Sequence, residues 1–193
     1  MNNSDTKQII LEAGAKIIHL KGYNHAGLQE ILKEAGVPKG SFYFHYASKE
    51  ALGLQIIDYY TVTLDALFSK CLQNESLPPL KRLEQLFNIF ESGFSRKDFT
   101  LGCPIGNLAL EMSDLNENFR KKLDSAIRLL TSHVKKCLED ARKDGSLSES
   151  INTDDAALFI FYSIEGAIMH LKTVKSTAPL ATCKKCIMDY LKA

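Results

Sequence analysis

Apolar residues recur every three or four positions along almost the whole chain, and this spacing constrains the fold more than any other feature of the sequence. It is typical of helices that bury one face, whereas a half-buried strand would alternate apolar and polar residues. The pattern is clearest over residues 52–67, 80–94 and 119–141. We therefore expect an all-α protein of about nine helices.

Glycine and proline residues divide this pattern into segments. Gly22 and Gly36 are placed to end the first two helices, and Pro38 suits the first turn of a third. Ser48 can cap a long fourth helix. These breaks predict a three-helix head over residues 1–48 and a larger helical body of six helices over residues 49–193.

Composition excludes several classes of protein. Hydrophobic residues make up 45% and charged residues 24% of the 193 residues, which is the ordinary globular range. The apolar stretch 156–164 is broken by Glu165 and is far shorter than the ~20 residues that cross a bilayer. Five scattered cysteines are typical of free thiols in a reducing compartment. We expect a cytoplasmic protein without secretory signal or membrane contact.

Positive charge is concentrated near the start of the chain. The net charge is only +1, but residues 1–49 hold six lysines against four acids. From Pro38 to Lys49 the only charges are Lys39 and Lys49, with His45 between them. A locally basic head on a neutral body is consistent with a modest electrostatic surface for nucleic acid.

Residues 30–43 have the pattern of a helix-turn-helix. Ala35 lets two helices approach, Gly36 makes the turn and Val37 fills the interface. An ordinary helical corner would have the same spacing, but the helix after the turn is unusually rich in hydrogen-bond donors. Phe42 within it is expected to fill the core of the head. The donors, which we expect to face DNA, are Lys39, Ser41, Tyr43, His45 and Tyr46.

The same region resembles the TetR/AcrR family of bacterial transcription regulators over about fifty residues. The matching positions are Gly22-Tyr23, Ile31, Ala35-Gly36-Val37, Gly40, Phe42-Tyr43, His45-Tyr46 and Ser48-Lys49-Glu50-Ala51-Leu52. The resemblance implies a homodimer that places two recognition helices in successive major grooves, with a ligand-binding body. It implies base contacts from Lys39, Gly40, Ser41 and Tyr43, and phosphate contacts from Tyr43, His45 and Lys49.

One departure concerns the start of the second helix. Members of the family usually carry Thr with Ser or Thr there, which caps the helix and touches phosphate, but this chain has Ala26-Gly27. Any phosphate contact at this point would have to come from a backbone N–H.

In the body, residues 102–114 are similar to the electrophile- and oxidant-responsive branch that includes NemR-like and AcuR-like repressors. Cys103 precedes Pro104 and would lie at a helix N-terminus, where backbone N–H groups favour a thiolate. Lys172 falls where this branch has a lysine that faces the cysteine. The alternative is a structural Cys103 and a reversible small-molecule pocket. Polar residues that could line such a pocket are Asn107, Glu111, His133, Glu165 and His170.

The leading hypothesis is a homodimeric repressor that binds a palindromic DNA operator and is released by a small molecule or an electrophile. A thiol oxidoreductase that uses the CxxC pair Cys183 and Cys186 is the alternative from another class. The sequence has no phosphate-binding loop, no metal-ligand pair and no nucleophile–base set, so we expect no enzyme, no metal and no cofactor.

The last two predicted helices carry more apolar surface than a small monomer would bury. We expect them to form the dimer interface. The residues expected there are Ala156, Ile160, Ile164, Ala167, Leu171, Leu180, Ile187 and Leu191.

Overall fold

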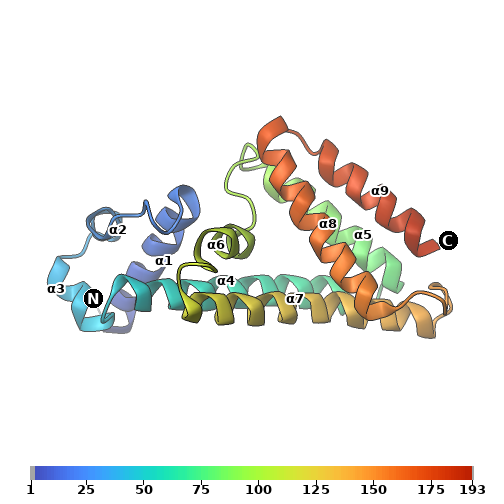
Figure 1. The fold of residues 1–193 in the computed structure, drawn as a ribbon, viewed down its shortest axis with the longest axis horizontal. Coiled ribbons are helices and arrows are strands. Elements are labelled where there is room, and N and C mark those ends of the chain that lie inside the picture. The colour runs from blue at the N-terminus through green and yellow to red at the C-terminus, as the bar shows by residue number, and fades with distance from the viewer. Residues whose placement is uncertain (1–2, 193) are drawn as a thin grey trace. The chain divides into compact units, whose positions relative to one another are not determined.

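The computed structural model describes residues 3–192, which form nine helices and no strand (Figure 1). The predicted all-α class is confirmed. The helices are α1 (Asn3–Lys21), α2 (Leu28–Ala35), α3 (Lys39–His45), α4 (Lys49–Leu72), α5 (Pro79–Ser95), α6 (Pro104–Met112), α7 (Glu117–Lys143), α8 (Thr153–Val174) and α9 (Ala178–Lys192).

Local chemistry explains several helix ends. Gly36 has φ +65°, and its N–H bonds to carbonyls of the last turn of α2, which favours a residue without a side chain. Pro79 is the first residue of α5, where its missing N–H removes no helical hydrogen bond. The side chain of Asn152 accepts from the N–H groups of Asp154 and Asp155 and caps α8.

The chain packs into two compact units, and their boundaries differ from the predicted single boundary between residues 48 and 49. The first unit runs to Val62 and also contains Pro104–Ala126; the second contains Thr63–Cys103 and the residues from Ile127 onward. The first part of α4, all of α6 and the beginning of α7 therefore pack with the head. The chain passes from the second unit back to the first between Cys103 and Pro104.

Phe42 on α3 lies at the centre of the first unit and is completely buried. Its ring stacks on that of Tyr46, with centroids 5.7 Å apart. Within the same unit, Tyr60 connects α4 to α1, because its hydroxyl donates a 2.8 Å hydrogen bond to the carbonyl of Ala15. Other buried side chains from α1, α2 and α4 complete this core: Ile10, Ile31, Leu52 and Ile56.

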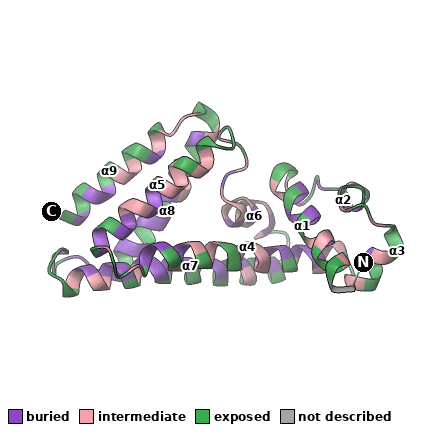
Figure 2. Cartoon of the chain, turned by 180° about the vertical axis from the view of Figure 1, so that it is seen from behind, coloured by how far each residue is buried: buried purple, intermediate pink, exposed green. Residues whose placement is uncertain are grey.

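The second unit has a continuous apolar core formed by α5, α7, α8, α9 and the end of α4. Buried and exposed residues alternate along these helices in Figure 2. The prediction that eight apolar residues of α8 and α9 lie at a dimer interface is wrong, because all eight belong to this internal core. They are Ala156, Ile160, Ile164, Ala167, Leu171, Leu180, Ile187 and Leu191.

A different stripe of α8 and α9 is exposed. Phe159, Tyr162 and Met169 follow helical spacing along α8 and are 46%, 60% and 65% exposed. Tyr190 on α9 is 42% exposed, and its ring meets that of Phe159 edge to face at 5.5 Å. α8 is thus apolar on two faces, one in the core and one toward solvent.

Among the helices of residues 3–192, only α8 is long and apolar enough to cross a membrane, a test that core helices also pass. Its own buried face packs in the core of the second unit. It also carries Glu165 and Lys172 in its second half. Packing therefore explains the apolar residues on the buried face of α8.

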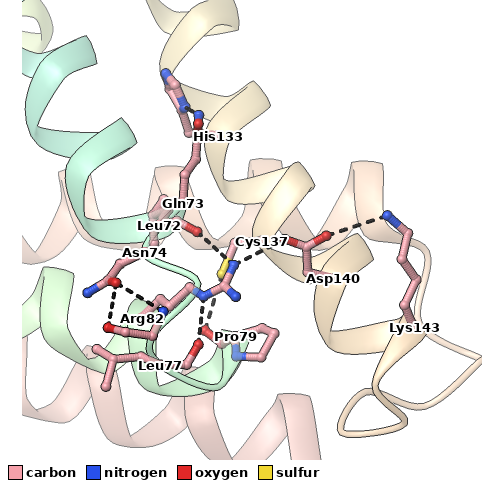
Figure 3. Close-up of polar contacts among 11 residues, drawn as sticks. Leu72, Gln73, Asn74, Leu77, Pro79, Arg82, His133, Cys137, Asp140 and Lys143 are labelled. Atoms are coloured by element: carbon pink, nitrogen blue, oxygen red, sulfur yellow. Dashed lines mark hydrogen bonds and ion pairs between the residues drawn. The ribbon is translucent and has the colours of Figure 1, made fainter.

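A buried arginine joins three helices of the second unit (Figure 3). Arg82 on α5 is 7% exposed. Its Nε donates to the carbonyl of Leu77 at 2.8 Å, and its Nη1 lies 3.3 Å from the carbonyl of Leu72 and 3.1 Å from Asp140 Oδ2 on α7. This one side chain fixes the link between α4 and α5 against α7.

Candidate nucleic-acid interface

α3 presents one buried face and one exposed face. Phe42 points into the core, whereas Lys39, Gly40 and Tyr43 are exposed and Ser41 is half-buried. The Nζ of Lys39 lies 5.8 Å from the centroid of the Tyr43 ring, so the cation and the aromatic side chain share one surface. The residues expected to contact bases are therefore brought together on the accessible side of α3.

Phe44 is the most exposed aromatic side chain of this face, at 71%, and our sequence reasoning missed it. Its ring meets His45 edge to face at 5.0 Å. A signal was available, because the buried pair Phe42 and Tyr46 is separated by four positions and leaves the residues between them on the other side. An exposed phenylalanine among donors is suited to the methyl group of thymine.

Tyr46 does not belong to this surface. It is 3% exposed, and its hydroxyl donates to the carbonyl of Lys7 on α1 at 3.1 Å. Burial raises the pKa of Tyr46 to about 12. The expectation that Tyr46 contacts DNA is corrected here: it was counted as a donor, but its ring packs on Phe42 and its hydroxyl holds α1.

His45 at the end of α3 and Lys49 at the start of α4 are both half-buried. The Nζ of Lys49 donates to the carbonyl of Tyr23 at 2.6 Å and lies 4.4 Å from the centroid of the Tyr23 ring. Burial lowers the pKa of Lys49, and the charge of Glu111 offsets part of that decrease. An ammonium group has three donors, so the bond to Tyr23 does not by itself prevent a contact with phosphate. Phosphate contact by Lys49 stays a prediction.

The start of α2 has no side-chain cap. Gly27 occupies the N-cap position without a side-chain hydrogen bond, and Ala26 before it is completely buried. The replacement of the usual Thr and Ser or Thr by Ala26-Gly27 therefore leaves this helix without a side-chain cap. Its first backbone N–H groups are the donors that this helix end can offer to phosphate.

Cys103 immediately precedes α6, as predicted, and is half-buried. Its thiol donates a hydrogen bond to the carboxyl of Glu165 on α8. Burial raises the pKa of Glu165, and the bond from Cys103 offsets part of that rise. The thiol therefore has a carboxyl group as a partner, and Lys172 is half-buried further along α8.

Two of the five polar candidates for a sensing pocket lie on α6, in the first unit. Asn107 is half-buried. Glu111 instead contacts the head: its Oε2 accepts from the N–H of Tyr23 and its Oε1 from the N–H of Asn24, both at 2.7 Å. The expectation that Glu111 lines a sensing pocket is therefore corrected, because both of its oxygens are bound to the turn between α1 and α2.

Three of the other four cysteines have thiols that burial makes harder to ionise. Burial raises the pKa of Cys71, of Cys183 to about 11 and of Cys137 to about 12. Cys186 is exposed, and its negative charge would further raise the pKa of Cys183. No group of three His, Cys, Asp or Glu side chains within residues 3–192 could hold a metal ion. This geometry gives the oxidoreductase alternative no support.

An open groove of about 580 Å³ runs between α8 and α9 in the second unit. Most of its lining is apolar or small, with single polar groups such as His170 and Thr182. Phe159 of the exposed stripe is part of its wall, as are Cys183 and Cys186 of the CxxC pair.

Comparison with known proteins links both parts of the chain to one group. Residues 10–56 match the family described as bacterial regulatory proteins, tetR family, and residues 79–187 match the tetracyclin repressor-like C-terminal domain. The chain is 31% identical to the HTH-type transcriptional repressor DhaR of Mycobacterium sp. strain GP1 over 93% of its length and 89% of the relative. It is 34% identical to the transcriptional regulator AcuR of Cereibacter sphaeroides over 90% of this chain and 79% of the relative.

A solved structure gives the same result for the fold. The reduced form of NemR from E. coli is 28% identical and superposes with a TM-score of 0.87, covering 96% of this chain and 97% of the other. The resemblance to the branch with NemR and AcuR is therefore confirmed.

Proposed function

The chain belongs to the TetR family of bacterial transcriptional regulators, with a helix-turn-helix DNA-binding domain, and we propose that it is a cytoplasmic, homodimeric repressor released from a palindromic operator by an inducer. The relatives it matches are regulators rather than enzymes. The observation that carries the proposal is the exposed face of α3, where Lys39, Gly40, Tyr43 and Phe44 are all accessible. Footprinting of the purified protein on the DNA that flanks its own gene tests it. Protection of a pseudo-palindrome is expected, and no protection would contradict the proposal.

Phe44 is expected to read thymine. Replacing one thymine in each half-site with deoxyuridine removes two methyl groups from the operator, each worth ~0.8 kcal/mol or about fourfold in affinity when it is buried against an apolar side chain. At one position of the half-site, the wild type should lose about fourfold per half-site, or roughly fifteenfold for the whole operator. Phe44→Ala should bind the normal operator more weakly and lose nothing further on deoxyuridine, as measured by fluorescence anisotropy.

Leu20→Ala is the control for this comparison of thymine and deoxyuridine operators, because Leu20 is 60% exposed but lies on α1. It should keep the full sensitivity to deoxyuridine. If Phe44→Ala keeps it as well at every thymine of the half-site, Phe44 does not contact a methyl group.

Dimerisation through the exposed stripe of α8 and α9 is supported by its apolar content. Phe159, Tyr162, Met169 and Tyr190 leave large apolar side chains in solvent next to the open groove, and contiguous apolar patches of this kind mark interaction sites. A two-fold interface would use the same patch on both copies and would match the symmetry of a palindromic operator.

Light scattering should report twice the chain mass of 21.6 kDa at micromolar concentration. The double variant Phe159→Asp/Tyr162→Asp places charges in the interface and should shift the protein to monomer. Val62→Asp alters a residue on α4 that is 68% exposed and should leave the dimer intact. A monomeric wild type, or a dimeric double variant, would contradict this interface.

For the inducer, we propose covalent modification of Cys103 by an electrophile. Its half-buried thiol lies directly before α6, at the point where the chain enters the first unit. The Glu165 carboxyl is placed to accept the thiol proton when sulfur bonds to an electrophilic carbon. The second candidate is a reversible ligand, with Cys103 and Glu165 as packing partners.

A further inference from the structure

Glu111 joins α6 to the turn that precedes the helix-turn-helix. Its two oxygens accept from two consecutive backbone N–H groups, those of Tyr23 and Asn24, each at 2.7 Å. Hydrogen bonds to an ionised acceptor are stronger than neutral ones. The next residue of α6, Met112, accepts a longer contact of 3.8 Å from the side chain of Asn24. The end of α6 therefore contacts this turn through two adjacent residues, Glu111 and Met112.

The turn is shaped to receive the carboxylate. Gly22 has φ +84°, a conformation that residues with side chains rarely adopt. A Cβ added at Gly22 would lie 2.9 Å from Oε2 of Glu111, closer than real contacts allow. Glycine thus suits this position for its backbone conformation, and a side chain here would also displace the carboxylate of Glu111.

The opposite side of the same peptide is held by α4. Lys49 donates to the carbonyl of Tyr23 at 2.6 Å, and the Tyr23 ring packs edge to face on Phe119 of α7 with centroids 5.0 Å apart. A Cβ at Gly53 of α4 would lie 2.6 Å from the Phe119 ring and 2.8 Å from the Tyr23 ring. Tyr23 is therefore fixed by its N–H, its carbonyl and its ring, and α6 supplies the first of these.

We propose that Glu111 is the positioning residue through which α6 and the DNA-binding head move together. This rests on the proposed function, since it concerns the regulation of the same DNA-binding surface. α2 begins at Leu28, four residues after Asn24, and α6 begins at Pro104, directly after Cys103. A displacement of α6 must therefore either pull the turn that leads into α2 or break two charge-assisted hydrogen bonds.

The first test uses the whole chain without DNA. Glu111→Ala removes both acceptors and should raise the amide exchange rates of Tyr23 and Asn24, measured by NMR, by about tenfold or more. Glu111→Gln keeps one carbonyl oxygen and should protect one of the two amides. Glu117→Gln is the control, since its carboxylate pairs on the surface of α7 with Arg120. Unchanged exchange rates in Glu111→Ala would show that Glu111 does not hold the turn at Tyr23 and Asn24.

The second test separates positioning from simple packing and needs no known inducer. Because coupling is reciprocal, binding of operator DNA should slow hydrogen exchange in residues 104–112 of the wild type and of Glu117→Gln. Glu111→Ala should still bind the operator but lose this effect on α6. If DNA still protects α6 in Glu111→Ala, or does not protect it in the wild type, the inference fails while the proposed function stands. A wild type that binds no DNA would instead contradict the proposed function.

Discussion

Replacing Arg82 with alanine is expected to lower the free energy of unfolding by about 3 kcal/mol. Removal of one partner of a buried pair costs about 3–5 kcal/mol, because the other partner is left without compensation. The lower end applies here, since the Asp140 side chain is 30% exposed whereas that of Arg82 is 8% exposed. The carbonyls of Leu72 and Leu77 would also lose their contacts with the guanidinium.

Urea denaturation followed by circular dichroism measures this change. Arg120→Ala is the matched control, because Arg120 pairs with Glu117 on the surface, with side chains 51% and 57% exposed. Exposed pairs of this kind contribute about 0–1 kcal/mol. Equal midpoints for the two variants would show that the Arg82 cluster does not hold α4, α5 and α7 together.

Cys103→Ser is expected to abolish release of DNA by a quinone while operator binding in reducing buffer stays unchanged. Alkylation forms a bond between sulfur and a ring carbon of the quinone, and the thiol proton passes to Glu165 and then to the reduced ring. The added group is attached to the residue that directly precedes Pro104, the first residue of α6. Serine keeps the size and hydrogen bond of the thiol but is not nucleophilic at this position.

Two further variants sharpen this result. Glu165→Gln should slow the alkylation of Cys103, measured by mass spectrometry, because the proton acceptor is lost. Cys186→Ser removes an exposed thiol of α9 and should leave release unchanged. If Cys103→Ser still releases DNA after quinone treatment, Cys103 is structural and a reversible ligand becomes the better account.

The positions of the helices could be predicted from the sequence, because their ends depend on local residues. Gly36 ends α2 because of its left-handed backbone conformation, and Pro79 begins α5 because it lacks an N–H. Each of these properties belongs to a single residue. The burial of Phe42 also followed from local pattern. The dimer face was predicted wrongly because α8 is apolar on two sides, and periodicity alone does not tell which side, Ile160 or Tyr162, turns into the core.

The site was predictable where neighbours in the sequence determine it and not where distant segments meet. Lys39 and Tyr43 share a surface because they are one helical turn apart on α3. Glu111 binds backbone amides 87 and 88 residues away, and these groups carry no signature in the sequence. The pairing of Cys103 with Glu165 is likewise a product of the folded second unit.

The exposed face of α3 is expected to read a specific DNA sequence. The most direct test compares the affinity of the wild type for the footprinted palindrome with its affinity for a scrambled duplex of equal length at the same salt concentration. Specific complexes are typically at least about 10³-fold tighter than non-specific ones, and we expect a ratio of this order that falls sharply in Lys39→Ala. Equal affinity for the two duplexes would contradict the account.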